Sequence, residues 1–230
     1  MKDDGGYNRR LFGKRGLRSY LHSARYHWVR RAIARHAVDC SSVVELGCFD
    51  GKLLDWLPSK PSAYFGFDAN WEGGLEIGRA RFRGDDSVSL FEITTPEELV
   101  VPARTKLGVA METLEHVPPA LLEPYLQKLA AISEVAIFTV PNEIGPVFAL
   151  KHAAKLVKYG GAEDYSFSEY IWQSLGQSQR VARNQHKGFD YRRFIRQVEN
   201  SFSTIEVSGI PSIGLPPVFS FGVGVVARPR

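Results

Sequence analysis

A short run of acidic and imidazole side chains follows one apolar segment of the chain. Glu112, Glu115 and His116 have the spacing E-x-x-E-H directly after the apolar residues 107–111. If the chain enters a helical turn there, the three side chains converge, because residues three and four apart are neighbours on a helix. Carboxylate and imidazole groups in such an arrangement can bind a divalent metal ion or transfer a proton.

A further histidine, His186, precedes a segment in which apolar residues recur at helical spacing. An unperturbed histidine has a pKa of about 6.5, so His116 or His186 could act as a catalytic general base near neutral pH. A buried histidine that is hydrogen-bonded for structural reasons is an equally good interpretation of either residue. The sequence therefore offers two candidate catalytic residues and leaves their roles open.

A second motif combines a buried strand with a glycine turn. In the segment VVELGCFDGKLLDWL, Gly47 and Gly51 allow a tight turn after the strand, and we expect a helix to start beyond them. The N-terminus of that helix would present free N–H groups to a ligand. Asp68 ends the next predicted strand, where its carboxylate can accept hydrogen bonds from both hydroxyls of an adenosine ribose.

Taken together, these motifs resemble those of class I S-adenosylmethionine-dependent methyltransferases over roughly residues 40 to 140. The resemblance implies that the glycine turn contacts the methionine part of the cofactor, that Asp68 holds the ribose, and that Glu92 or Ile93 meets the adenine. Phe49 stands where the family most often has a glycine, so the turn must accept a side chain there. The full set of implied cofactor residues is Glu45, Gly47, Cys48, Phe49, Gly51, Asp68, Glu92, Met111 and Glu112.

Two groups within this family carry motifs similar to those after the fourth strand. The segment METLEHV is similar to one in ubiquinone-biosynthesis O-methyltransferases. The E-x-x-E-H motif, the later VPN and the histidine of NQHKGF resemble a metal-site pattern of small-RNA 2′-O-methyltransferases, although Gly188 interrupts the register. That second resemblance implies Mg²⁺ or Mn²⁺ held by Glu112, Glu115, His116 and His186. Related enzymes without a metal use such a histidine to line the cofactor pocket or cap a helix.

The elements that must position these residues alternate between strand and helix from residue 42 onward. This order predicts an α/β fold: a Rossmann-like, seven-stranded methyltransferase sheet with helices on both faces. The last two strands have no room for a crossover helix between them, so we expect a terminal antiparallel hairpin, which a symmetric dinucleotide fold lacks. The predicted strands are 42–46, 63–68, 88–93, 107–111, 135–140, 204–210 and 218–226.

Two segments lie outside this core pattern. Residues 1–39 form a basic N-terminal arm and helix, with ten Lys and Arg against two acids in residues 1–36. Leu17, Leu21, Ala24, Trp28 and Ala32 would pack that helix on the methyltransferase domain, 40–230, and turn Arg18, Arg25 and Arg35 partly outward. About residues 142–185, we expect an inserted helical cap over the substrate pocket, whose aromatic residues could alternatively form the cap's own core.

Composition limits the remaining choices. The chain has 230 residues and 44% hydrophobic content, enough for one domain with a sizeable core. It has neither a signal-like apolar start nor an apolar run of about 18 residues. Cys40 and Cys48 form no C-x-x-C motif, which argues against structural zinc and disulfides. We therefore expect a cytoplasmic protein, although the basic arm leaves peripheral membrane contact open and the oligomeric state is not predicted.

Three functions fit these features. The first is S-adenosylmethionine-dependent O-methylation of a hydroxyl on a small molecule or glycan. The second is RNA 2′-O-methylation, favoured by the basic arm and by a later group of basic residues, Arg180, Arg183, Lys187, Arg192, Arg193 and Arg196. The third is cofactor binding without catalysis. A nicotinamide dehydrogenase fits poorly, because Gly47 and Gly51 give G-x-x-x-G rather than G-x-G-x-x-G.

Overall fold

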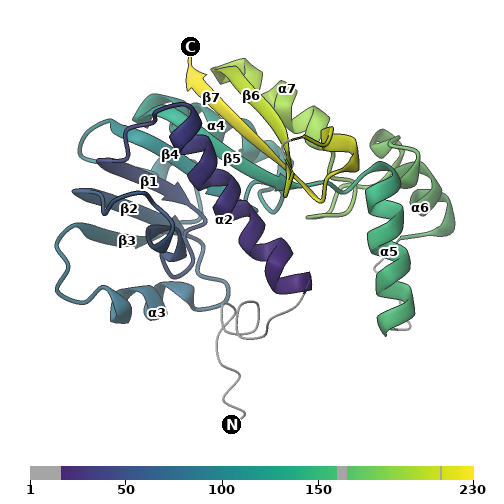
Figure 1. Cartoon of the computed structure of the whole chain (residues 1–230), viewed down its shortest axis with the longest axis horizontal. Helices are drawn as coiled ribbons and strands as arrows, with labels where there is room; N and C mark the ends of the chain where they lie inside the picture. Colours follow the sequence, from purple (N-terminus) through teal and green to yellow (C-terminus); the bar gives the residue numbers. More distant parts are fainter. Residues whose placement is uncertain (1–16, 160–164, 213) are drawn as a thin grey trace, which may run out of the picture.

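The computed structural model describes residues 17–159, 165–212 and 214–230, which form one seven-stranded sheet (Figure 1). The strand order is β3-β2-β1-β4-β5-β7-β6, and β7 runs antiparallel to both of its neighbours, β5 and β6, whereas the pairs among β1 to β5 are parallel. The predicted fold class is thereby confirmed, including the terminal hairpin. The strands are β1 Ser42–Leu46, β2 Ala63–Asp68, β3 Val88–Glu92, β4 Thr105–Met111, β5 Ser133–Pro141, β6 Phe202–Ile210 and β7 Gly222–Pro229.

Helices cover both faces of the sheet. On one face, α4 (Pro119–Ile132) and α7 (Tyr191–Ser201) bury Leu126, Leu129 and Phe194 in a cluster with Phe138 of β5. On the other face, α2 (Leu17–Arg35) and α3 (Gly74–Arg81) contribute to a second buried cluster that includes Trp28. Central strands buried on both sides must be apolar along their whole length, which explains why the sequence signalled them clearly.

The crossover between β1 and β2 differs from the prediction. Only a short 3₁₀ helix, Lys52–Asp55, follows the glycine turn, where we expected an α-helix. Pro58 and Pro61 lie within the few residues left before β2 and disfavour a longer helix. Helix α2 covers this part of the sheet instead: the ring of Tyr26 stacks on Trp56, with 5.4 Å between centroids.

Helices α5 (Gly145–Tyr159) and α6 (Phe167–Ser174) connect β5 to α7 and lie to one side of the sheet (Figure 1). Phe148 and His152 of α5 pack against Tyr165 and Tyr170, with ring centroids between 4.8 and 5.9 Å apart. These aromatic side chains therefore form a core of their own. No helix in the described part of the chain is long and apolar enough to cross a membrane.

Candidate active site

The main cavity has a volume of about 580 Å³ and lies at the carboxyl ends of β1, β2 and β4. Ligands of open α/β sheets bind at this edge, because the loops that leave it can form a crevice. Its lining includes nearly all of the predicted cofactor residues: Glu45, Gly47, Cys48, Phe49, Asp68, Met111 and Glu112. None of the described residues between 142 and 185 lines this cavity, so the expected cap does not wall it there.

The glycine turn has the tight geometry that its sequence predicts. Gly47 has a φ of +77°, and a Cβ at this position would collide with the side chain of Thr113. The N–H groups of Gly47 and Cys48 both donate to the carbonyl of Phe67, at 2.6 and 3.1 Å. Phe49, with a φ of 50°, occupies the position where the family most often has a glycine, and its ring lies over Gly74. The turn thus accepts the side chain by packing its ring against Gly74.

Asp68 is held by the backbone on either side of it. One carboxylate oxygen accepts a hydrogen bond from the N–H of Phe49 at 2.9 Å, and the other accepts one from the N–H of Asn70 at 2.7 Å. Each carboxylate oxygen has two lone pairs, so each retains one for a ligand. Because Asp68 also lines the cavity, its carboxylate is oriented to receive two hydroxyl groups.

Glu45 lies at the base of the cavity and is almost fully buried. The hydroxyl of Tyr64, itself inaccessible to solvent, donates a hydrogen bond to its carboxyl group. Burial raises the pKa of Glu45 to about 8, and the nearby carboxylates of Asp50 and Asp68 act in the same direction. The carboxyl group of Glu45 therefore holds its proton to a higher pH than an exposed glutamate does.

The structure brings Ile93, but not Glu92, to the cavity. The Glu92 side chain is exposed and accepts a hydrogen bond from the Asn70 side-chain amide at 3.3 Å. Of the two residues predicted to meet the adenine, Ile93 is therefore the one in a position to do so. Gly51 does not itself line the cavity but lies between the lining residues Asp50 and Lys52. Its φ of +73° allows the backbone to turn there.

Sequence reasoning missed the contribution of α2 to the cavity. Arg25, which we expected to turn partly outward, is half-buried and lines the cavity together with its neighbour Tyr26. Tyr26 is only 5% exposed, and burial raises its pKa to about 12. The helical spacing that identified Ala24 and Trp28 as buried places Arg25 at the border of the same face, so the spacing alone could have raised Arg25 as a candidate.

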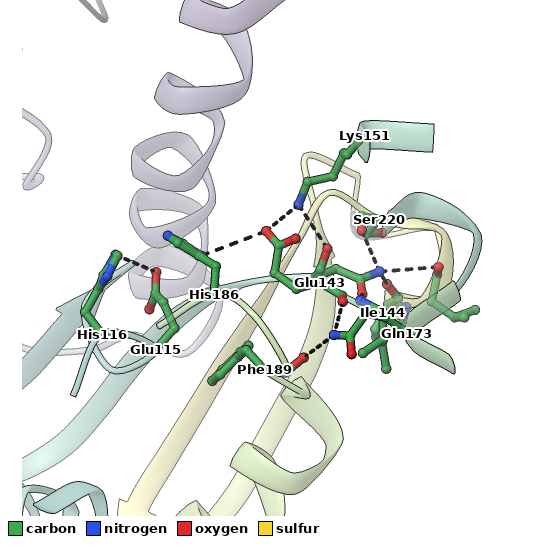
Figure 2. A network of polar contacts seen from close by, with 12 residues as sticks. Glu115, His116, Glu143, Ile144, Lys151, Gln173, His186, Phe189 and Ser220 are labelled. Carbon is green, nitrogen blue, oxygen red and sulfur yellow. Dashed lines mark hydrogen bonds and ion pairs between the residues drawn. The ribbon is translucent and has the colours of Figure 1, made fainter. Parts of the chain in front are cut away.

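Glu115, His116 and His186 come together at the edge of the main cavity (Figure 2). Each contributes a potential ligand atom, and these atoms lie within 4.8 Å of one another. The two imidazole rings meet edge to face with centroids 4.5 Å apart, and His116 Nε2 lies 3.8 Å from Glu115 Oε1. The loop after β4 and the loop before α7, far apart in sequence, thus form one side-chain cluster, which we call the histidine cluster.

Within the histidine cluster, the Glu115 carboxyl group lacks hydrogen-bond partners. Its side chain is fully buried, and no donor among the described residues reaches either oxygen. Burial and the nearby Glu112 carboxylate raise its pKa well above the ordinary value. Buried carboxylates are costly unless they are paired or bind a metal. A divalent cation would satisfy both oxygens, so this donor set fits the metal that the sequence implied.

Glu112 is not part of the histidine cluster, contrary to the prediction of a four-residue ligand set. Strand β4 ends at Met111, and the Glu112 N–H continues the sheet by donating to the carbonyl of Thr139 at 2.8 Å. With a φ of 51°, Glu112 then turns the chain sharply instead of starting a helical turn. Its side chain lines the main cavity close to the histidine cluster but outside it.

The two histidines differ in environment. Burial, together with the charges of His186 and Arg183, lowers the pKa of His116 to about 4. His116 is consequently neutral near pH 7, the form that can accept a proton or bind a metal ion. His186 is more exposed, and its Nδ1 lies 3.9 Å from Glu143 Oε1, to which Lys151 Nζ donates at 2.8 Å (Figure 2). Glu143, in the VPNE segment after β5, was not predicted to take part.

No protein-family model and no curated protein sequence matches the chain. Solved structures do match. An S-adenosylmethionine-dependent methyltransferase from Clostridium acetobutylicum superposes with a TM-score of 0.64 at 11% identity, covering 96% of this chain and 95% of that chain. The small RNA methyltransferase HEN1 gives 0.60 at 16% identity, covering 91% of this chain and 25% of that chain.

A third structure, the magnesium protoporphyrin IX methyltransferase ChlM from Synechocystis with bound S-adenosylhomocysteine, gives a TM-score of 0.54 at 14% identity. It covers 96% of this chain and 92% of that chain. The three similarities cover 91–96% of this chain. The chain therefore has the fold of the S-adenosylmethionine-dependent methyltransferases.

Proposed function

We propose that the protein transfers the methyl group of S-adenosylmethionine to a hydroxyl oxygen. In this proposal, the glycine turn at Gly47 contacts the methionine part of the cofactor, the Asp68 carboxylate accepts from the ribose hydroxyls, and Ile93 meets the adenine. The observation that supports it most strongly is the position of the histidine cluster, which borders the same cavity as these cofactor residues. Cofactor and acceptor groups could thus meet in one cavity.

Methyl transfer is an in-line displacement at the methyl carbon bound to sulfur. The acceptor oxygen forms the new bond as the carbon–sulfur bond breaks, and the acceptor proton must leave. Holding the two reactants in line can contribute about 7–11 kcal/mol to such a step. Met111, Val117 and Leu121 give this part of the cavity an apolar lining. Without a bound metal, the half-buried His186 would be the group to accept the proton.

A divalent cation, Mg²⁺ or Mn²⁺, fits Glu115, His116 and His186. When bound, it would lower the pKa of an acceptor hydroxyl and favour the alkoxide. The neutral state of His116 and the unpaired carboxyl group of Glu115 support this part of the proposal. Glu143 would orient His186 through the ring nitrogen that faces it, with Lys151 holding the Glu143 carboxylate in place.

A hydroxyl on a small molecule or glycan is our first candidate acceptor. RNA is the second, because the histidine cluster resembles the metal-site pattern of small-RNA 2′-O-methyltransferases and the fold matches HEN1. Binding of S-adenosylhomocysteine without transfer to any acceptor would instead indicate a non-catalytic protein.

Metal binding can be measured directly by the electron paramagnetic resonance of Mn²⁺ titrated with the protein. We expect Glu115→Gln to weaken Mn²⁺ binding by about tenfold or more, since it removes a charged ligand. Glu112→Gln is the matched control, because Glu112 is close to the histidine cluster but outside it. Chelation by EDTA should abolish methyl transfer, and added Mn²⁺ should restore it. Full activity in EDTA would remove the metal from the proposal while leaving methyl transfer intact.

A further inference from the structure

A second cavity, of about 290 Å³, lies between the first turns of α4 and α7 and the turn at residues 178–180. We call it the side pocket. Val117 lines both the side pocket and the main cavity. The loop after β4, which carries Glu115 and His116 of the histidine cluster, therefore lies between the two cavities. Its floor is apolar: Val117, Leu122, Val181, Phe189 and Phe194.

The polar lining of the side pocket consists mainly of hydrogen-bond donors. Two arginines, Arg183 and Arg193, face it together with the side chains of Gln179 and Gln197. The Arg193 side chain is exposed, and no hydrogen bond or ion pair joins it to any other described residue. Guanidinium groups are the side chains best suited to bind phosphate oxygens, because their fork of N–H donors matches the geometry of the anion.

Three of the neighbouring basic residues contact other groups. Arg180 stacks on the ring of Trp172 at 4.3 Å, and Lys187 donates to Glu169 at 2.9 Å. Arg192 binds the Asp190 carboxylate at 2.8 Å and also donates to the carbonyl of Gly176. Among the basic residues that Sequence analysis names between 180 and 196, Arg183 and Arg193 are therefore the two that line the side pocket.

One acidic residue, Asp190, also lines the side pocket. Its carboxylate is nearly buried and accepts hydrogen bonds from Ser178 Oγ at 2.7 Å and from Arg192 Nε at 3.0 Å. Because Arg192 neutralises Asp190, the charges of Arg183 and Arg193 are not cancelled within the pocket. The pocket thus has an excess of positive charge above an apolar floor.

Arg183 connects the side pocket to the histidine cluster. Its Nη2 donates to the backbone carbonyl of Glu115 at 2.6 Å, and its guanidinium lies 4.9 Å from the centre of the Phe189 ring. Its Nη1 is buried, and none of the described residues accepts a hydrogen bond from it. An anion at Arg183 would therefore lie close to the backbone of the residue that anchors the histidine cluster.

We propose that the side pocket binds a phosphate group of the methyl acceptor, so that the acceptor is a phosphate ester whose hydroxyl reaches His116 and His186. The role of this ligand as the methyl acceptor rests on the proposed function. The phosphate site itself is defined by Arg183 and Arg193. A sugar phosphate or nucleotide and the backbone of RNA share this chemistry. Both place a hydroxyl a few bonds from a phosphate.

The test is a titration of the full-length protein with inorganic phosphate, followed by ³¹P nuclear magnetic resonance. We expect Arg193→Gln to weaken phosphate binding by about tenfold, since a charge-assisted contact is lost. Arg196→Gln is the matched control, because Arg196 lies on the same helix as Arg193 and is exposed but does not line the side pocket. It should change the dissociation constant less than about twofold. Ribose 5-phosphate and a short oligoribonucleotide then distinguish the two sources of phosphate.

Equal effects of Arg193→Gln and Arg196→Gln would overturn the proposal, because they would show general surface electrostatics. Absence of phosphate binding to the wild-type protein at millimolar concentrations would overturn it too. Neither result depends on methyl transfer, so the outcome is separable from the proposed function. If Arg193→Gln alone loses phosphate binding and the wild-type protein transfers no methyl group, the result would support a phosphate site in the side pocket and contradict the proposed methyl transfer.

Discussion

At the end of the main cavity where we propose that the cofactor binds, the backbone orients the Asp68 carboxylate before any ligand binds. The N–H groups of Phe49 and Asn70 fix its two oxygens, so little ordering is required on binding. We expect Asp68→Ala to weaken binding of S-adenosylhomocysteine by about 1.5–3 kcal/mol in isothermal titration calorimetry, through loss of charge-assisted hydrogen bonds. Glu92→Ala, at the end of the adjacent strand but outside the cavity, is the control and should bind normally.

Arg25 places a positive charge in the cavity, and the amino-acid part of the cofactor carries a carboxylate. We therefore expect Arg25→Ala to weaken S-adenosylhomocysteine binding by about tenfold. Binding of methylthioadenosine, which lacks the amino-acid part, should change by less than about twofold. Equal losses for both ligands in calorimetry would show that Arg25 acts by supporting the cavity rather than by pairing with the carboxylate.

Glu45 makes the stability of the protein depend on pH. Its pKa is raised from 4.5 to about 8 in the folded chain, so between these values the unfolded state loses a proton that the folded state retains. The contribution of Glu45 to the free energy of unfolding is thus intact below pH 4.5 and falls by at most about 1.4 kcal/mol per pH unit as the pH rises toward 8.

Glu45→Gln keeps the shape of the side chain and removes the titration. Relative to the wild type, we expect this variant to become more stable as the pH rises from about 5 to about 8, as measured by urea unfolding. Parallel stability profiles for the two proteins over this range would contradict the raised pKa.

The individual site residues were predictable to different degrees. Gly47 and Asp68 follow from their places at strand ends, and the pairing of His116 with His186 follows from a family resemblance. The position of Glu112 could not be predicted, because its left-handed φ results from a hydrogen bond to β5, a strand that comes later in the chain. Helical spacing places Arg25 at the border of the buried face of α2, but it does not show that the main cavity lies beside that border.

Among the elements, α2 compensates for the missing helix between β1 and β2. Its Trp28 is fully buried, donates through Nε1 to Ser208 Oγ at 3.0 Å, and lies against Gly224 of β7. The strands were predictable because parallel strands buried on both faces form continuous apolar runs. The short crossover between β1 and β2 was not predictable, because the residues GKLLDWL have the spacing of a longer helix. The packing of Tyr26 on Trp56, which takes the place of that helix, involves a distant segment of the chain.

The contact between α2 and β7 gives a prediction at this scale. A methyl group on Gly224 would overlap the Trp28 indole, so we expect Gly224→Ala to lower the free energy of unfolding by about 1–3 kcal/mol. Gly214→Ala is the control, because the nearest atom to its added Cβ would be Ser212 Oγ at 3.9 Å. If urea unfolding shows equal stability for both variants, α2 does not pack tightly against β7.

At the scale of the whole molecule, the parallel sheet brings distant residues to one edge. The turn after β1, the end of β2 and the loop after β4 all meet there, and His186 joins them from the loop before α7. Helix α2 closes the cofactor side of the main cavity with Arg25 and Tyr26, and the side pocket opens beyond the histidine cluster. The order from cofactor site to histidine cluster to side pocket is what our functional proposal requires.

The most direct test of that proposal is transfer of a radiolabelled methyl group from S-adenosylmethionine into a cell extract separated into RNA, glycan and organic-soluble fractions. We expect label in the glycan or small-molecule fraction with the wild-type protein, and its loss with Asp68→Ala. Ribonuclease-sensitive label would favour RNA as the acceptor. If the wild-type protein binds S-adenosylhomocysteine in calorimetry yet labels no fraction, methyl transfer by this protein is contradicted.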